Sequence, residues 1–404
     1  MKRTSRQFGF RSVMMAAGVI AAAAGLGVAA AERAGQRAQP AQQGQPAAPA
    51  AQRQAPVPGA SVFRLLTFEV GTSGPRLGTT RGNGDEEIVD VHNAILYLLR
   101  SGAPEGKTIP AIPIDMRALI EAGDRPIAAV RSLHRTITAL KASGKFTEPG
   151  GIHRVFHPPS GIKYLPPITN PSKILGLAGN YIRRTPDGKP GAYDFAEYPS
   201  AFLKPQTALT GHNSEINLEG LLTTGVHYGE LAFVIGKTAT NVPESEAMDY
   251  VMGYTIFNDV SARDLKQGSH GSQGSTISKG LDTFAPTGPY ITLREDVPNP
   301  HNLPIEVIVN GKPWPAYSSL TNANTSFLTF TVAQTVAYFS ERTTLLPGDI
   351  ISTGVPAPVV ELRVGDTVEI TVGHLGTLRS TVVSNSVPGH KSFPPRTVAP
   401  MPVR

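Results

Sequence analysis

The sequence contains no cysteine among its 404 residues and only one tryptophan. The lack of cysteine excludes a disulfide scaffold, a zinc knuckle, an iron–sulfur site and a thiolate nucleophile. Charged residues are few, at 17%, whereas glycine and proline, with 41 and 36 copies, together make up about a fifth of the chain. This composition favours a turn-rich β protein over a helical bundle, and the length predicts one large catalytic domain with appendages.

The formal net charge of +6 comes from one end of the chain. Residues 1–60 carry seven lysines and arginines and one acidic residue, which leaves 30 basic and 30 acidic residues in the remainder. Because that remainder has no net charge, it gives no electrostatic reason to expect nucleic-acid binding. We therefore predict a small-molecule partner and no nucleic-acid partner.

The N-terminus has the pattern of an export signal. A basic stretch, Lys2 to Arg11, precedes uncharged residues 12–31, which are rich in alanine and glycine and end in Ala29-Ala30-Ala31 before Glu32. Small residues at that position fit cleavage by signal peptidase. We expect residues 1–31 to be a signal peptide and the protein to be periplasmic or secreted. The alternative is an uncleaved anchor that makes the membrane a partner, since about 20 residues can just span a bilayer.

Two further segments are predicted to be spacers. Residues 32–59 contain no large aliphatic or aromatic side chain apart from Val57, and residues 384–404 are proline-rich and basic. Such segments cannot bury enough apolar area to offset the entropy lost on ordering. Between them we predict a small N-terminal α+β module at 60–165 and a catalytic domain at 170–383.

Short β-rich runs dominate the part of the chain between the spacers. Helical patterns are clearest at 92–100, 115–142, 244–250 and 332–342. Strands are predicted at 62–68, 88–91, 174–178, 230–235, 254–257, 289–292, 305–309, 350–352 and 368–372. Many strands and few helices predict an α+β protein with a dominant rolled sheet.

Two carboxylates adjoin apolar runs in which an unpaired charge would be costly. Glu230 opens the run Leu231–Ile235, and Asp259 closes the run 253–258. A buried unpaired carboxylate costs several kcal/mol, so Glu230 needs a cation. Helix capping or pairing with Arg263 would account for Asp259 alone. A shared Mg²⁺, which binds few protein oxygens and keeps its waters, would account for both carboxylates.

Several sequence blocks resemble the fumarylacetoacetate hydrolase family in order and spacing. They lie at 231–237, 253–265, 278–289, 346–357 and 376–379, and the stretch from Phe63 to Leu77 with residues 88–90 resembles the small N-terminal module of that family. The resemblance implies a mixed β-roll, usually dimeric, with Mg²⁺ or Mn²⁺ held by carboxylates. It also implies action on 2-oxo acids or 1,3-dicarbonyl compounds by C–C hydrolysis, decarboxylation or isomerisation.

The resemblance assigns roles to individual residues by their match to the family motifs. Glu230 and Asp259 match metal ligands, Lys279 matches the active-site lysine, and Arg263 matches an arginine that supports the site. The remaining predicted positions are a basic residue in the catalytic site, Arg184, and three substrate-binding residues, Lys266, Thr353 and Tyr181.

Four positions depart from the family pattern. Tyr228 stands where the pattern has a second glutamate, and a one-residue slip would bring His227 near the metal instead. Arg184 replaces the histidine base of many members, and arginine cannot act as a base at neutral pH. Val355 replaces a threonine hydroxyl, and Lys266 occupies a position often held by glutamine.

These departures leave two hypotheses open. In the first, the protein is an exported hydrolase or lyase with a two-carboxylate metal site, and Arg184, Lys266 and Lys279 hold an anionic dicarbonyl or 2-oxo acid substrate. In the second, the same basic residues capture a carboxylate without chemistry, in a protein with a degenerate metal site. We favour the enzyme, acting as a homodimer.

Overall fold

The computed structural model describes residues 62–81, 87–102, 111–182, 197–218, 225–227, 229–262, 277–314, 323–356 and 360–385. The predicted signal peptide, the first spacer and nearly all of the C-terminal spacer lie outside these ranges. All of the described residues belong to one compact unit. Within the described ranges, every helix is too short or too polar to cross a bilayer.

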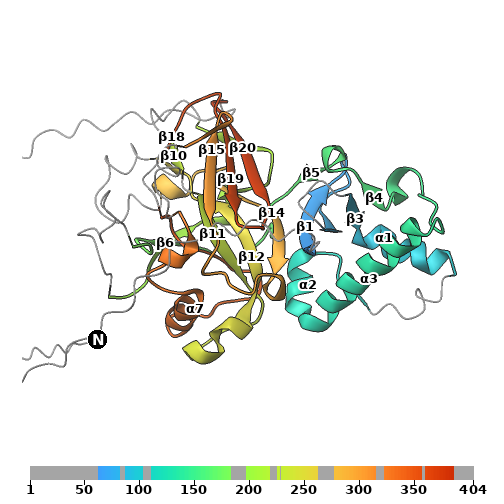
Figure 1. The fold of residues 1–404 in the computed structure, drawn as a ribbon, viewed down its shortest axis with the longest axis horizontal. Helices are drawn as coiled ribbons and strands as arrows, with labels where there is room; N and C mark the ends of the chain where they lie inside the picture. Colours follow the sequence, from blue (N-terminus) through green and yellow to red (C-terminus); the bar gives the residue numbers. More distant parts are fainter. Residues whose placement is uncertain are drawn as a thin grey trace, which may run out of the picture. The chain divides into compact units, whose positions relative to one another are not determined.

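The first part of the described chain builds three strands and three helices (Figure 1). The elements are β1 Arg64–Glu69, β2 Arg76–Thr80, β3 Ile88–Asp90, α1 Val91–Arg100, α2 Met116–Ala122 and α3 Asp124–Ala142, followed by the short strands β4 Phe156–His157 and β5 Lys163–Tyr164. Aspartates fix where two helices begin. The Asp90 carboxylate accepts from Asn93 N at 3.0 Å, and that of Asp115 accepts from Ala118 N at 2.9 Å.

A twelve-stranded sheet runs through the molecule in the order β4-β3-β2-β1-β14-β12-β11-β17-β6-β7, with β5 on β1 and β8 on β14. Its later strands are β6 Ile174–Ala178, β7 Ser200–Lys204, β8 Leu209–Thr210, β11 Gly229–Ile235, β12 Val251–Asn258, β14 Ala285–Leu293 and β17 Ile350–Ser352. Strand β1 pairs antiparallel with β14, with Leu65 opposite Ile291. The predicted division at 165–170 therefore separates strands of one continuous sheet.

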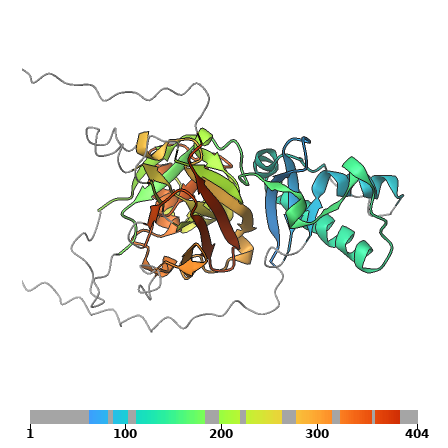
Figure 2. The same ribbon diagram turned by 90° about the horizontal axis from the view of Figure 1, so that it is seen from above.

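Two smaller sheets complete the roll. One has the order β16-β15-β19-β20-β9 and the other the order β13-β10-β18. Their strands are β9 Ser214–Asn217, β10 Gly225–His227, β13 Ser261–Ala262, β15 Ile305–Val309, β16 Lys312–Pro313, β18 Val360–Leu362, β19 Thr367–Val372 and β20 Thr377–Val383. Strands β15 and β19 contact β11, and β19 and β20 contact β12. The five-stranded sheet therefore packs against the central strands of the twelve-stranded sheet (Figure 2).

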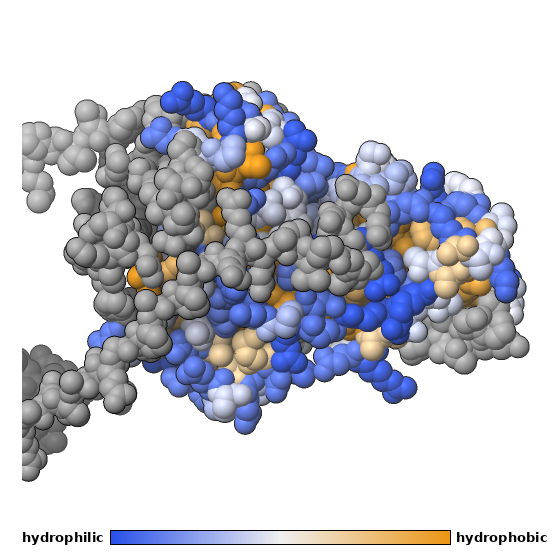
Figure 3. Space-filling model, viewed as in Figure 1, coloured by the Kyte–Doolittle hydropathy of each residue, from blue (hydrophilic) through white to orange (hydrophobic). Residues whose placement is uncertain are grey.

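Strands β11 and β12 are buried along their whole length because both of their faces are covered. That burial explains their continuous apolar sequences. Gly253 allows β12 to approach β14, since a Cβ there would lie 2.3 Å from the carbonyl oxygen of Thr292. On the face drawn in Figure 3, hydrophilic side chains predominate among the described residues, and apolar ones form small patches.

The α+β class with a rolled sheet is confirmed. The predicted helix at 332–342 is α7, Val332–Ser340, which begins with a capping box formed by Thr331 and Gln334. The predicted helix at 244–250 is instead a 3₁₀ helix, Glu244–Tyr250, in which Glu246 N donates to Pro243 O at 3.0 Å. In the described ranges the other 3₁₀ turns are Gly151–His153, Pro159–Gly161, Gln206–Ala208, Arg294–Asp296 and Thr325–Phe327.

Candidate active site

Glu230 and Asp259 lie at the same end of two neighbouring strands. Glu230 is the second residue of β11 and pairs with Phe257 of β12, while Asp259 directly follows β12. Both residues are buried, with 2% and 3% of their surface exposed. The antiparallel register thus brings two charged side chains, 29 positions apart in the sequence, into one buried region.

Asp259 accepts hydrogen bonds from two lysine ammonium groups. Lys204 Nζ, at the end of β7, donates to Oδ1 at 2.8 Å, and Lys279 Nζ donates to Oδ2. Burial by itself would raise the pKa of Asp259, but Lys204 and then Lys279 outweigh it and hold that pKa below its ordinary value. Asp259 is therefore a carboxylate that stays ionised inside the protein.

Lys204 is the most deeply buried group of this cluster. Its side chain is fully buried, and Nζ also donates to the carbonyl oxygen of Val260 at 3.0 Å. Burial lowers the pKa of Lys204 to about 8, against the opposing attraction of Asp259. Lys279 is 15% exposed, and its Nζ lies 4.6 Å from the centre of the Phe202 ring.

Glu230 has a different environment. Its Oε2 accepts a hydrogen bond from the Ser352 hydroxyl and another from Gly354 N at 2.9 Å. Burial and then the negative charge of Asp259 raise the pKa of Glu230 well above its ordinary value, although Lys279, Gly354 and Lys204 oppose them. The two neighbouring carboxyl groups therefore differ in pKa: that of Glu230 is raised and that of Asp259 is lowered, so Glu230 holds a proton more tightly.

Thr353 and Tyr181 fix the loop that follows β17. Thr353 N and Oγ1 each lie 2.9 Å from the carbonyl oxygen of Leu231 and donate to it. The Tyr181 hydroxyl lies 3.3 Å from Thr353 Oγ1, and Asn180 Nδ2 donates to the carbonyl oxygen of Thr353 at 3.1 Å. These bonds hold Gly354 N in place against Glu230.

The structure brings together Glu230, Asp259 and Lys279, as the sequence predicts, and sets Thr353 and Tyr181 beside them. Four other positions named from the sequence, Arg184, Arg263, Lys266 and Tyr228, lie outside the described residues. The backbone of His227 belongs to β10 and pairs with that of Val360 in β18.

Sequence reasoning missed Lys204 and Ser352. Lysine is almost never fully buried unless it is paired, so a lone lysine at the end of a short strand gives no signal by itself. For Ser352 a signal exists, because it is a polar residue at the end of the apolar strand Ile350–Ser352.

The residues present fit a hard divalent cation. Carboxylate oxygens are the ligands that Mg²⁺ and Mn²⁺ prefer, and Mg²⁺ is commonly held by one or two carboxylates, with waters and substrate oxygens completing the shell. Glu230 and Asp259 provide two such groups. No set of three or more His, Cys, Asp or Glu side chains suited to a metal occurs in the described part of the chain.

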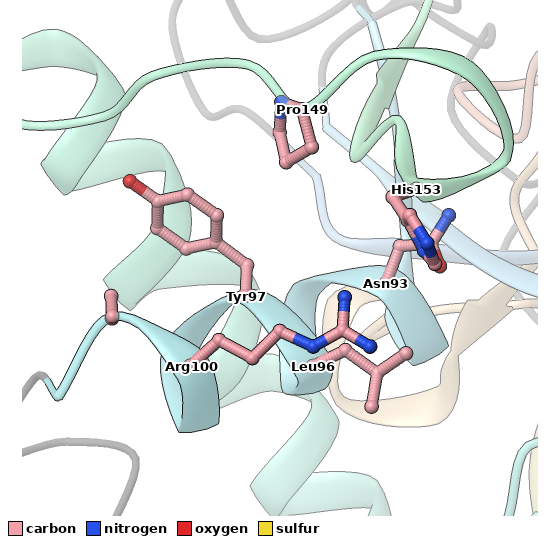
Figure 4. Close-up of a pocket in the computed structure, with 7 residues that line it drawn as sticks. Asn93, Leu96, Tyr97, Arg100, Pro149 and His153 are labelled. Carbon is pink, nitrogen blue, oxygen red and sulfur yellow. The ribbon is translucent and has the colours of Figure 1, made fainter.

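A separate cavity of about 300 Å³ lies beside helix α1, in the N-terminal part of the chain (Figure 4). It is lined by Asn93, Leu96, Tyr97, Arg100, Ser101, Pro149 and His153. The Asn93 side chain donates to the carbonyl oxygens of Ile152 and Arg154 at 2.9 and 2.8 Å, so it holds a loop in place. None of the residues predicted for the site lines this cavity.

The family model for the fumarylacetoacetate (FAA) hydrolase C-terminal domain matches residues 173–383. The chain belongs to this family. It is 33% identical to the oxaloacetate tautomerase YisK of Bacillus subtilis over 306 residues, which are 74% of this chain and 93% of that protein. It is 30% identical to the mitochondrial oxaloacetate tautomerase FAHD2A of Bos taurus over 328 residues, 79% of this chain and 91% of that one.

Solved structures of this family have the same fold. A maleylpyruvate hydrolase from Sphingobium sp. SYK-6, in complex with manganese (II) ion and pyruvate, is 27% identical with a TM-score of 0.57, and the match covers 80% of this chain and all of that one. A 2-hydroxyhepta-2,4-diene-1,7-dioate isomerase from Mycobacterium marinum is 30% identical with a TM-score of 0.54, covering 80% and 98%. The family thus contains hydrolases, isomerases and tautomerases, and the chain is a member of an enzyme family.

Proposed function

We propose that the chain is an exported, divalent-metal-dependent enzyme that cleaves a C–C bond in anionic 2-oxo acids or acylpyruvate-like 1,3-dicarbonyl compounds. The observation that supports this most directly is the buried cluster of Glu230, Asp259, Lys204 and Lys279. Burying ionisable groups is costly, and perturbed groups of this kind concentrate where a reaction moves charge.

The proposed chemistry passes through an enolate. The bond that breaks joins the carbon next to the 2-oxo group to the leaving carbon, which departs as CO₂ or, after attack by water, as a carboxylic acid. Its electron pair forms a C=C bond and is delocalised onto the 2-oxo oxygen as an enolate. A divalent cation on Glu230 and Asp259 would stabilise that negative charge as a Lewis acid. Lys279 adds a positive charge near the same oxygen, and Lys204 keeps Asp259 ionised. Arg184 and Lys266 are proposed to hold the carboxylates of the substrate, with Arg263 supporting the site.

Within this proposal, C–C cleavage without water, such as decarboxylation, is favoured over hydrolysis. Hydrolysis needs a base that activates water, and Arg184, at the position of the histidine base, stays protonated. Decarboxylation of a 2-oxo dicarboxylate needs an electron sink and no activated water. Oxaloacetate is therefore the first substrate to test, and similar proteins are named oxaloacetate tautomerases.

The test is turnover by the purified chain with Mg²⁺ or Mn²⁺. We expect loss of oxaloacetate and release of pyruvate faster than with the same metal alone, or hydrolysis of an acylpyruvate. Lys279→Ala should lower kcat by about 100-fold or more, whereas Lys163→Ala, whose side chain is 72% exposed, serves as the matched control and should not. A folded chain that binds oxaloacetate without turning over either compound would favour the second hypothesis, a carboxylate-binding protein.

Two further parts of the proposal concern the whole protein. We propose that it is exported to the periplasm or secreted after cleavage of residues 1–31, and that it works as a homodimer. Cell fractionation with N-terminal sequencing tests the first part, and light scattering of the mature chain tests the second. An uncleaved chain in the membrane fraction would favour the anchor instead.

A further inference from the structure

We propose that Phe202 is a positioning residue of the candidate active site, whose ring fixes where the ammonium group of Lys279 lies beside Asp259. This inference rests on the proposed function, because Lys279 is the group that adds positive charge near the enolate oxygen. Phe202 takes no part in the chemistry itself and acts through Lys279. It is not among the site residues that the sequence predicts.

The Lys279 ammonium group contacts both a carboxylate and an aromatic ring. Its Nζ donates to Asp259 Oδ2 and lies over the Phe202 ring, 4.6 Å from the ring centre. A cation within about 6 Å of a ring centre is attracted by the negative face of the ring, and more strongly where water is excluded. The Lys279 side chain is only 15% exposed, so this contact is largely shielded from solvent. The hydrogen bond limits the distance of Nζ from the carboxylate, and the ring limits the directions in which Nζ can lie around it.

Strand β7 supplies the ring and the second lysine of the cluster from one face. Successive side chains of a strand point to opposite faces, so Phe202 and Lys204 share a face. Leu203, between them, is 58% exposed on the other. Lys204 Nζ donates to Asp259 Oδ1, whereas the Phe202 ring lies against the lysine that donates to Oδ2. One short strand therefore provides one of the two ammonium groups around Asp259 and contacts the other.

A glycine on the neighbouring strand makes room for the ring. Phe202 pairs with Gly176 of β6, and a Cβ at position 176 would lie 2.5 and 2.6 Å from two carbons of the ring. Side chains of residues that face each other across two strands are direct neighbours, so any residue larger than glycine would push the ring aside. The absence of a side chain at Gly176 thus lets the ring lie where it meets Lys279.

The first test measures the coupling between Phe202 and Lys279 without metal, substrate or turnover. It is a double-mutant cycle on urea unfolding of the full chain, with Phe202→Leu, which keeps an apolar side chain, and Lys279→Gln, which removes the charge. The factor by which Phe202→Leu raises the unfolding equilibrium constant should be about three- to tenfold smaller in the Lys279→Gln chain. Phe146→Leu is the matched control, because its ring packs on those of Tyr97 and Phe156, and its effect should be the same with and without Lys279.

The second test follows turnover of oxaloacetate, or of an acylpyruvate, by the same variants with Mn²⁺. Phe202→Leu should lower kcat by about tenfold and leave KM within about twofold, because the ring affects the charge that meets the transition state. In the Lys279→Gln chain, Phe202→Leu should lower kcat by less than about twofold, since the lysine through which it acts is absent. Phe146→Leu should keep the kcat of wild type.

A third variant keeps the ring but moves it. Gly176→Ala places a Cβ against the ring and should reproduce the loss of kcat seen in Phe202→Leu. It should cause little further loss when both changes are combined. Gly150→Ala is the control, because a Cβ there would meet nothing within 4 Å, and it should keep the kcat of wild type.

The inference and the proposed function fail in different ways. Additive effects of Phe202→Leu and Lys279→Gln on unfolding, or a wild-type kcat in Phe202→Leu, would overturn the positioning role and leave the proposed function standing. An equal loss of kcat from Phe202→Leu with and without Lys279 would also overturn it, because the ring would then act by another route. Coupled unfolding in a chain that turns over neither compound would overturn the proposed function and, with it, the catalytic purpose of the contact.

Discussion

Lys204 illustrates how single residues set the charge of the site. A fully buried lysine is tolerated because Asp259 accepts from it at 2.8 Å and Val260 O at 3.0 Å. Burial still lowers the pKa of Lys204 to about 8. Asp259 in turn owes its low pKa to Lys204 more than to Lys279, because the fully buried lysine exerts the stronger attraction. Lys204 and Asp259 form a buried ion pair, and Lys279 contacts the same carboxylate.

Replacing Lys204 by methionine should therefore destabilise the protein strongly. Lys204→Met keeps the length of the side chain but leaves Asp259 with Lys279 as its only ammonium partner among the described groups. Breaking a buried ion pair by removal of one partner costs about 3–5 kcal/mol. Denaturant unfolding at pH 7 measures this loss.

A double variant identifies the source of the loss. In Lys204→Met with Asp259→Asn, the buried negative charge that has lost Lys204 is also removed, so part of the lost stability should return. A double variant no more stable than Lys204→Met alone would show that packing around Lys204, and not its charge, provides the stability.

The residues of the site differ in how well the sequence predicts them. Glu230 and Asp259 are identifiable because the first opens an apolar run and the second closes one, and burial makes such positions costly without a partner. The partner of Asp259 was not identifiable in the same way. Lys204 lies 55 positions away, and its contact depends on the pairing of β6 with β7, which local sequence does not determine.

At the level of elements, helix α3 carries a buried histidine against the first strands. His134 Nδ1 lies 2.8 Å from the Thr79 hydroxyl of β2, and its ring meets that of Phe63 edge-on at 5.6 Å. Burial, and then the charge of Arg81, lower the pKa of His134 to about 4. The packing of α3 therefore requires a neutral imidazole.

This requirement predicts a loss of stability in acid. The ordinary pKa of histidine is 6.5, so between pH 6.5 and 4 the unfolded chain binds a proton at this site that the folded chain does not. Stability is therefore unaffected above pH 6.5 and falls as the pH drops through that window, by about 3 kcal/mol. In His134→Gln the difference in unfolding free energy between pH 7 and pH 4.5 should shrink by about 2–3 kcal/mol.

The exposed His92 of helix α1 provides the control. His92→Gln should keep the pH dependence of wild type, because that side chain faces solvent. Equal pH dependence in His134→Gln and wild type would mean that another group, such as the half-buried His212, whose pKa is also lowered to about 4, dominates the acid response.

Elements were predicted well where burial leaves a clear pattern. Strands β11 and β12 are buried throughout and read as continuous apolar runs, and α1 and α3 have the periodicity of helices with one buried face. The segment 244–250 is a 3₁₀ helix within the connection 236–250 between β11 and β12, and its local pattern did not distinguish this from an α-helix.

At the scale of the whole molecule, one apolar core joins the N-terminal part to the roll. Leu65 of β1 and Leu119 of α2 belong to the same buried cluster as Val234, Phe257 and Ile350 of the central strands. Because β1 also pairs with β14, the N-terminal part extends the sheet beyond β14 and covers one face of its central strands. The sequence predicts the two parts but not this shared core, which depends on the long-range pairing of β1 with β14.

The shared core predicts that the two parts do not fold independently. A chain that begins at residue 166 would leave the β1 side of β14 unpaired and the apolar face of the central strands exposed. We expect this shortened chain to aggregate or to melt more than about 10 °C below a chain that begins at residue 60, which should unfold in a single transition. Circular dichroism and dye binding to exposed apolar surface measure both properties. A soluble shortened chain with the full melting temperature would instead identify residues 170–383 as an autonomous domain and the N-terminal module as an accessory.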